Sequence, residues 1–334
     1  MRFARPQLRP VRRLSALAAV LTLALGAAAC GGGDDAASGD GSGPVTVRVG
    51  VIPIMDVAPL YLGREQGFFA EEGITVEPQE FAGGAEILPA VQSGDLQFGF
   101  SNTASLLIGA SKGLPVRMVA QGVQEAADEQ DSWSHIWVRA DSGIKTPKDL
   151  EGKRLSVNTL RNVPEVTARA SLEKHGVDLS KIQFVEVPFP EANAALEQGQ
   201  VDAIYVVEPF DTVARQSGAR PLVAPLYETE PSLTVAAYFT TQAYIEENPE
   251  VVERFVRAMN KSLEYAAQNP EAVRKTLGEY TKIPDNLLGE VRLGQWSSDL
   301  NRESIQGMHD LSKKYGLLEG EANLDELIWT PNGS

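Results

Sequence analysis

Short polar and acidic side chains follow several predicted strands of this 334-residue chain. In an open α/β sheet, a small molecule binds at the carboxyl ends of the strands, beside the N-termini of the next helices. We therefore expect ligand-binding residues in four loops, at Asp56, Val57, Ser101, Asn102, Thr103, Asn158, Thr159, Arg161, Asn162 and Glu208. Most of these residues are of types that bind a ligand by hydrogen bonds or charge. None is next to a histidine that could activate it as a nucleophile.

The two carboxylates in this set constrain the ligand. Asp56 and Glu208 would repel a bare anion such as nitrate, but they suit a ligand that presents N–H donors or positive charge. An aminopyrimidine or an amino-sulfonate is such a ligand. A flat heterocycle would also stack on an aromatic wall. Four aromatic residues are candidates, although packing in a core or hinge is the stronger expectation for each: Tyr61, Trp133, Trp137 and Tyr205.

Each polar candidate also has a purely structural interpretation. The run 101–103 can cap a helix, and Asn162 with Glu165 matches a capping box. Arg161 can be a solvated loop charge, and Asp56 can simply end a strand. These alternatives remain open at the level of sequence.

Alternating strands and helices position these loops. Valines at 45, 47, 49 and 51 alternate with other residues, as in a strand. Strand-like segments recur with helical segments between them, many of which end at glycine. This order predicts an α/β fold with a mostly parallel sheet. From Asn248 the chain is helical, and one apolar face predicts core packing: Val251, Val252, Phe255, Val256, Met259 and Leu263.

The N-terminus carries a secretion signal. Five arginines and a roughly 15-residue apolar run precede Cys30, the only cysteine. The Ala-Ala-Ala-Cys sequence at 27–30 resembles the lipobox of bacterial lipoproteins, which implies that the Cys30 thiol is lipidated after removal of residues 1–29. The alternative is an ordinary signal peptide cut near Ala29. Residues 30–44 are then a flexible linker of Gly, Ser, Asp and Ala.

Charge and cysteine content exclude several classes of protein. Residues 30–334 contain 25 Lys and Arg against 45 Asp and Glu, a formal net charge of −20. Such a surface argues against nucleic acid as a partner. Without a cysteine after Cys30, neither disulfides nor thiolate metal sites are expected, and the histidines at 135, 175 and 309 lack metal-ligand spacing. No metal and no cofactor are expected.

Several motifs, in order, resemble the type 2 periplasmic solute-binding proteins that serve importers of nitrate, sulfonates, taurine and thiamine-pyrimidine precursors. These motifs are PLYLG at 59–63, GFF at 67–69, EGI at 72–74, SGDLQFG at 93–99, GLPV at 113–116, LEGK at 150–153, LEQGQVDA at 196–203 and EPF at 208–210. The resemblance runs from about residue 45 to 269. Each motif alone is weak, but their order makes the signal strong.

The resemblance implies two Rossmann-like lobes, joined by two crossover strands, that close on a ligand between them. We expect lobe 1 to contain residues 45–133 and 241–334, and lobe 2 residues 134–240. The family's matching acidic position, here Glu208, often meets amino or N–H groups of the ligand. The implied protein is a monomeric receptor, lipid-anchored on the outer face of the bacterial cell membrane. It would deliver its ligand to an ABC permease with ATPase subunits.

Other functions are weighed against this one. The same fold can bind a simple anion, such as an alkanesulfonate, nitrate or an aromatic carboxylate. An enzyme resembling the fungal pyrimidine synthase is more remote, since that relative lacks a leader. The G-x-S-x-G match at 109–113 places Ser111 at the end of a helix, where a nucleophile elbow cannot form. We therefore do not expect an enzyme. A structural surface lipoprotein is a third class, which ligand binding would exclude.

Overall fold

The computed structural model describes residues 44–331, which form two α/β lobes. The predicted signal peptide, Cys30 and the linker up to residue 43 lie outside the described residues. Within residues 44–331, none of the helices combines the length and the apolar character needed to cross a membrane.

Lobe 1 is built on a five-stranded sheet. Its strands, in spatial order, are β2 (Ile74–Glu80), β1 (Val45–Val51), β3 (Phe98–Asn102), β10 (Thr234–Thr241) and β4 (Val116–Gln124). β1 is parallel to β2 and β3, whereas β10 is antiparallel to both of its neighbours. The edge strand β2 contains Pro78, which has no N–H to offer to another chain.

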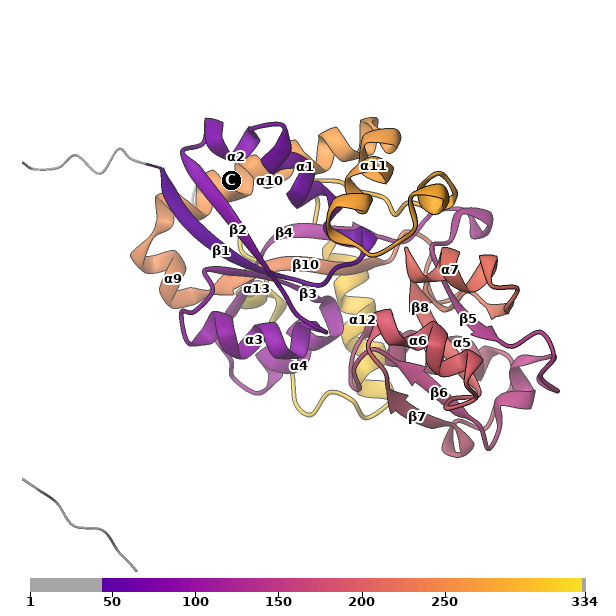
Figure 1. The fold of residues 1–334 in the computed structure, drawn as a ribbon. Coiled ribbons are helices and arrows are strands. Elements are labelled where there is room, and N and C mark those ends of the chain that lie inside the picture. The colour runs from indigo at the N-terminus through magenta and orange to yellow at the C-terminus, as the bar shows by residue number, and fades with distance from the viewer. Residues whose placement is uncertain (1–43, 332–334) are drawn as a thin grey trace, which may run out of the picture. The chain divides into compact units, whose positions relative to one another are not determined.

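Helices cover both faces of this sheet. Figure 1 shows α1, α10 and α11 on one face and α3 and α4 on the other. The helices of lobe 1 are α1 (Ala58–Glu65), α2 (Phe68–Glu71), α3 (Gly84–Gln92), α4 (Thr103–Ser111), α9 (Gln242–Glu247), α10 (Pro249–Gln268), α11 (Pro270–Tyr280), α12 (Arg302–Lys314) and α13 (Leu324–Leu327), with short 3-10 turns η1 (Met55–Val57) and η5 (Asp285–Glu290). The apolar stripe predicted on α10 is buried, so the prediction of core packing is confirmed.

Lobe 2 has the same design. Its strands, in spatial order, are β7 (Gln183–Glu186), β6 (Arg154–Val157), β8 (Ala203–Val207), β5 (Ser134–Val138) and β9 (Arg220–Val223). Its helices are α5 (Val163–Lys174), α6 (Phe189–Glu197), α7 (Phe210–Gln216) and α8 (Pro225–Thr229), with 3-10 turns η2 (Glu129–Asp131), η3 (Pro147–Leu150) and η4 (Leu179–Lys181). β5 is antiparallel to β8 and β9, so each lobe has a mixed, mostly parallel sheet.

Two adjacent crossovers connect the lobes. The backbone N–H of Glu125 donates to the carbonyl of Leu233 at 2.9 Å, and that of Ser232 donates to Ala126 at 3.3 Å. The expected boundaries at residues 133 and 240 are therefore wrong. The chain leaves lobe 1 near residue 125, and it returns near residue 233 because β10 lies in lobe 1 between β3 and β4. The sequence pattern predicts that β10 is a buried strand, but it does not indicate whether that strand joins the sheet of lobe 1 or the sheet of lobe 2.

α1 and α10 approach so closely that only glycine fits at residue 63. A Cβ on Gly63 would lie 1.9 Å from Oγ of Ser262 and 2.8 Å from the ring of Phe69. The Ser262 hydroxyl is held by a 2.7 Å hydrogen bond to the carbonyl of Ala258. The contact therefore cannot relax by a simple rotation of that side chain.

We expect Gly63→Ala to lower the free energy of unfolding by about 1–3 kcal/mol, because the added methyl group forces the two helices apart. Urea unfolding followed by circular dichroism measures this change. Gly143→Ala is the matched control, since a Cβ at Gly143 meets no atom within 4 Å. Equal stability of the two variants would contradict the close helix contact.

Candidate functional site

The loops that follow the strands of the two lobes meet one another. Asn102, at the end of β3 in lobe 1, accepts a 3.2 Å hydrogen bond from the backbone N–H of Val163, the first residue of α5 in lobe 2. Nearby, a Cβ on Gly83 of lobe 1 would lie 2.6 Å from Cγ2 of Thr159 in lobe 2. The two lobes are therefore in direct contact, as in a closed binding cleft.

A cavity of about 380 Å³ lies between the lobes. Lobe 1 contributes Ile52, Pro53, Ile54, Glu80, Phe81, Ala82 and Glu86, and lobe 2 contributes Pro188, Phe189, Pro190, Glu191 and Phe210. The rings of Phe189 and Phe210 are 6.3 Å apart and inclined by 19°. Phe81 is the aromatic residue that lobe 1 adds to this lining. A volume of this order suits a small solute, and such walls suit a flat apolar body.

The charged residues that line this cavity are all acidic: Glu80, Glu86 and Glu191. All three side chains are exposed at the rim. Their summed field attracts positive charge and N–H donors and repels anions, although each contribution is weak because water and salt screen it. The cavity itself therefore favours the amino-bearing type of ligand.

Helix N-termini meet at the lobe contact as well. Asn102 caps α4 by accepting a 2.9 Å hydrogen bond from the backbone N–H of Ser105. The hydroxyl of Ser101 is buried without a hydrogen-bond partner, and a Cβ on Gly84, the first residue of α3, would lie 2.0 Å from it. Free N–H groups at helix starts favour an anion or a hydrogen-bond acceptor. This part of the contact therefore suits the acceptor end of a ligand.

The structure brings three of the predicted residues of lobe 2 into one cluster. The Asn162 amide donates to Oδ1 of Asn158 at 2.7 Å and to Oγ1 of Thr159 at 3.1 Å. Its own oxygen accepts from the backbone N–H of Glu165 at 3.1 Å, so Asn162 caps α5. The predicted capping box is not complete, because the Glu165 carboxylate accepts from the N–H of Arg161. Asn158, Thr159 and Asn162 thus lie beside the lobe contact at Val163, facing Asn102 and Gly83.

Two predicted residues, Thr103 and Val57, are buried within lobe 1. The Thr103 hydroxyl donates to the carbonyls of Thr234 and Val235 at 3.2 and 3.3 Å. Val57 is fully buried in the core. Both side chains hold the loop rather than line the cavity described above.

Asp56 is also buried within lobe 1, near Tyr238 and Tyr280. Burial raises the pKa of Asp56 to about 7, opposed by a hydrogen bond from its own backbone. Its Oδ1 atom and the Tyr238 hydroxyl have no hydrogen-bond partner. Asp56 is therefore a buried carboxyl with one unpaired oxygen, and it is not part of the cavity lining.

Glu208 is buried at the lobe junction, where its carboxylate bonds to the protein itself. Oε1 accepts from the Thr212 hydroxyl at 2.8 Å and from the backbone N–H of Arg292 at 3.1 Å, and Oε2 accepts from the Thr212 backbone at 3.1 Å. Burial, together with the nearby charge of Asp211, raises the pKa of Glu208 to about 8. Its backbone carbonyl accepts from Met55 of lobe 1 at 3.0 Å.

Two further buried carboxylates at this junction escaped the sequence prediction. Glu125 begins the first crossover, and burial raises the pKa of its carboxyl to about 8. Asp211 accepts hydrogen bonds from Trp137 at 2.7 Å and from His135 at 2.9 Å, with Arg292 3.9 Å away. The hinge region therefore concentrates acidic groups in a dry environment.

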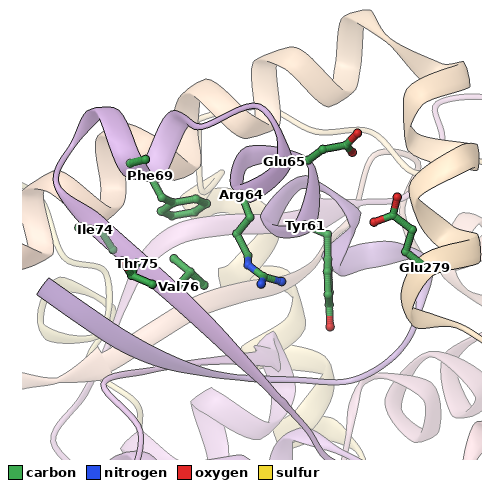
Figure 2. Close-up of a pocket in the computed structure, with 9 residues that line it drawn as sticks. Tyr61, Arg64, Glu65, Phe69, Ile74, Thr75, Val76 and Glu279 are labelled. Carbon is green, nitrogen blue, oxygen red and sulfur yellow. The ribbon is translucent and has the colours of Figure 1, made fainter. Parts of the chain in front are cut away.

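The aromatic candidates from the sequence lie elsewhere. Trp133, Trp137 and Tyr205 are buried in the lobes, consistent with core packing. Tyr61 lines a second hollow of about 430 Å³ on lobe 1, formed by α1, α2, β2 and α11 (Figure 2). The Arg64 guanidinium lies 5.8 Å from the centre of the Tyr61 ring, with Glu65 on the same helix and Glu279 on α11. This hollow lies within lobe 1 and includes none of the predicted ligand residues.

The residues of the cavity wall could have been found from the sequence. Phe81, Phe189 and Phe210 follow β2, β7 and β8 within three residues of each strand end. Aromatic side chains after strands are therefore a signal for this cavity wall, as polar side chains are for the lobe contact. Within residues 44–331, no group of three or more His, Cys, Asp or Glu side chains is arranged to hold a metal ion.

Two α/β lobes, paired crossovers and a cavity between the lobes define the class of bilobal solute-binding proteins. The chain belongs to the NMT1/THI5-like family, whose model matches residues 54–273. The formylaminopyrimidine-binding protein of Halalkalibacterium halodurans is 25% identical over 221 residues, which span 65% of this chain and 64% of that protein. The taurine-binding periplasmic protein of Escherichia coli is 24% identical over 248 residues, spanning 74% and 73%.

The fold is also that of solved solute-binding proteins. The alkanesulfonate-binding protein SsuA from Xanthomonas axonopodis pv. citri, bound to MOPS, superposes with a TM-score of 0.72 at 19% identity. The superposition covers 86% of this chain and 99% of SsuA. The expected two-lobed α/β architecture with a cleft is confirmed.

Proposed function

We propose that this chain is the extracytoplasmic receptor of an ABC importer. It captures a small polar organic solute of the aminopyrimidine or amino-sulfonate type between its lobes and delivers it to a permease with ATPase subunits. The family and the periplasmic binding proteins among its relatives support this role. Closure stabilises the bound state because the solute contacts both lobes only when they meet.

The interlobe cavity carries the proposal for the ligand class. Its walls are aromatic and aliphatic, and its charged lining is wholly acidic. A solute with a flat or apolar body and a donor-bearing or cationic group matches both properties. Its acceptor end would then meet the helix starts at Ser101 and Asn102, with Asn158, Thr159 and Asn162 on the opposite lobe.

A simple anion is the second candidate, because of one specific observation. The buried Ser101 hydroxyl has no partner and lies beside the start of α3, close to the starts of α4 and α5. An alkanesulfonate, nitrate or carboxylate would accept hydrogen bonds from the Ser101 hydroxyl and from the start of α3, which no side chain caps. In that case the acidic rim would play no part in binding.

Anchoring and export are proposed from the N-terminus. Removal of residues 1–29 would leave Cys30 as a lipidated first residue, and the linker 30–44 would tether a monomeric receptor to the outer face of the membrane. Mass spectrometry of the membrane fraction tests this directly. A mature N-terminus without a diacylglyceryl mass on Cys30 would contradict it.

A thermal-shift panel on the mature chain with Cys30→Ser tests the ligand class. We expect aminopyrimidines or taurine to raise the melting temperature by a few degrees, since a ligand at about 100 times its Kd adds about 2.7 kcal/mol. A shift with only alkanesulfonates or nitrate would replace the proposal by the anion alternative. The absence of any shift would count against a receptor for these classes.

The enzyme alternative is addressed by the same panel. Ser111 ends α4 and donates to the carbonyl of Ile108 at 2.9 Å, a helix-end contact rather than an elbow. A binding protein returns its ligand unchanged. Chromatography of each stabilising compound after prolonged incubation would reveal turnover, which would contradict a purely binding role.

A further inference from the structure

α12 lies between the two lobes. It packs against α4 of lobe 1 and against α5 of lobe 2. Figure 1 shows it in yellow beside both helices. A change in the angle between the lobes must therefore alter its contacts with at least one of them.

Lobe 1 holds α12 and the segment after it at several points. Near the start of the helix, the Ser304 hydroxyl accepts a 2.9 Å hydrogen bond from the backbone N–H of Thr234 in β10. After the helix, a Cβ on Gly320 would lie 3.5 Å from the carbonyl of Ser111 at the end of α4. Further on, Trp329 donates to the carbonyl of Met118 in β4 at 2.9 Å. The C-terminal segment therefore moves with lobe 1.

Lobe 2 contacts this segment through two charged side chains. The Arg161 guanidinium donates a 2.6 Å hydrogen bond to the carbonyl of Leu317 and lies 3.7 Å from Glu319. At the other end of α5, Glu173 accepts a 2.9 Å hydrogen bond from the Tyr315 hydroxyl and forms an ion pair with Lys314. The predicted ligand contact Arg161 is thus directed at the partner lobe.

The backbone of Arg161 is held in an unfavourable conformation. Its φ is 57°, in the left-handed region that residues with a Cβ rarely occupy. The Arg161 N–H donates to Oε2 of Glu165 at 2.8 Å, and the neighbouring Asn162 caps α5. Such a conformation persists only where surrounding contacts fix it, and here those contacts aim the side chain at Leu317.

We propose that Arg161 and Glu173 form a latch that holds the lobes closed through residues 314–317, without contacting the solute. The effect of the latch on binding rests on the proposed function. Because the solute binds the closed form, the latch sets the fraction of the protein that is closed and able to hold the solute. Arg161 and Glu173 are therefore positioning residues for binding. In this chain they tune affinity whatever the solute is.

The test measures the distance between lobes without any solute. Since Cys30 is the only cysteine, Cys30→Ser leaves a background for spin labels at Gln92→Cys in lobe 1 and Gln198→Cys in lobe 2. Both positions are exposed. Double electron–electron resonance then gives the open and closed populations of the mature chain, so a failure to find a solute leaves this test intact.

We expect Arg161→Ala to raise the open-to-closed ratio about tenfold, the effect of losing one charged hydrogen bond between lobes. Glu173→Gln should shift the ratio in the same direction by less, because its ion pair is exposed. Arg161→Gly gives a second variant that relieves the backbone strain, so that it folds while lacking the guanidinium.

The matched control is Arg154→Ala. Arg154 also donates to a carbonyl, that of Gly199 at 3.0 Å, and its side chain is 40% exposed, as is that of Arg161. Both partners of that bond lie in lobe 2, so its loss should leave the distance distribution unchanged. Unchanged distributions in both Arg161→Ala and Arg161→Gly would overturn the latch, as would an equal shift in Arg154→Ala.

Discussion

The free energy of unfolding is expected to fall by several kcal/mol as the pH rises from about 5 to about 8. Glu125 and Glu208 are fully buried, and burial raises the pKa of each from 4.5 to about 8. Asp56 adds to the effect, since burial raises its pKa to about 7. Most proteins lose stability toward acid through their carboxylates, so this dependence in the neutral range has the opposite sign.

The sign follows from proton counting. Between pH 4.5 and 8, the folded protein keeps protons on these carboxyls that the unfolded chain has released. Folding therefore takes up protons, and stability falls with rising pH. The contribution is complete below the unfolded pKa and is lost as the pH passes through the folded one. A rise in the pKa from 4.5 to about 8 corresponds to roughly 5 kcal/mol for one group.

Glu125→Gln isolates one such group. Oε1 of Glu125 accepts the 2.8 Å hydrogen bond from Ala126, which an amide oxygen can replace, and Oε2 has no partner to lose. We expect the variant to show a flatter pH profile and to gain stability relative to the parent at pH 8.5. Urea unfolding at several pH values measures both. Exposed Glu247 provides the control Glu247→Gln. If Glu125→Gln kept the full pH dependence of the parent's free energy of unfolding, Glu125 would not be one of its causes.

Replacing Phe81 and Phe210 together by alanine is expected to weaken the binding of an aminopyrimidine about 100-fold. The two rings belong to opposite lobes and line the same cavity, so a flat ring between them loses both contacts. Each contact contributes about 1–1.5 kcal/mol, and 1.4 kcal/mol equals a tenfold change in Kd. Isothermal titration calorimetry measures the change.

Taurine separates stacking from general damage in this experiment. It has no ring, so its affinity should change far less in the same double variant. Phe184→Ala serves as the protein control, because Phe184 is half-buried in lobe 2 and packs on Arg169 outside the cavity. Equal losses for taurine and the aminopyrimidine would show that the rings act on the fold rather than on the ligand.

Sequence pattern predicted the regular elements well where periodicity was strong. The alternating valines of β1 and the apolar face of α10 are local signals, and both elements are confirmed. The short strand β9 contains Pro221 and only four residues, so it lacked such a signal. The sheet that β10 joins depends on pairing with residues more than 100 positions away, which no local pattern contains.

The site was less predictable for the same physical reason. Asn162 was predicted to cap a helix and does cap α5, and Asn158, which directly follows β6, accepts a hydrogen bond from it. Whether a side chain faces a cavity depends on how two lobes meet. Glu208 was expected to meet a ligand, but its carboxylate is occupied by Thr212 and Arg292, the latter more than 80 residues away. Arg161 was expected to do the same, but its guanidinium reaches Leu317.

The position of β10 determines the order in which the molecule can be completed. Lobe 2 is a continuous stretch of chain inserted between β4 and β10, and β10 is flanked by strands made long before it. As the chain emerges from its N-terminus, lobe 2 can assemble while β3 and β4 still lack the strand between them. Lobe 1, whose first strands are synthesised earliest, is thus the last to complete its sheet. A truncation before Thr234, where β10 begins, should leave lobe 1 with an open, aggregation-prone gap in its sheet.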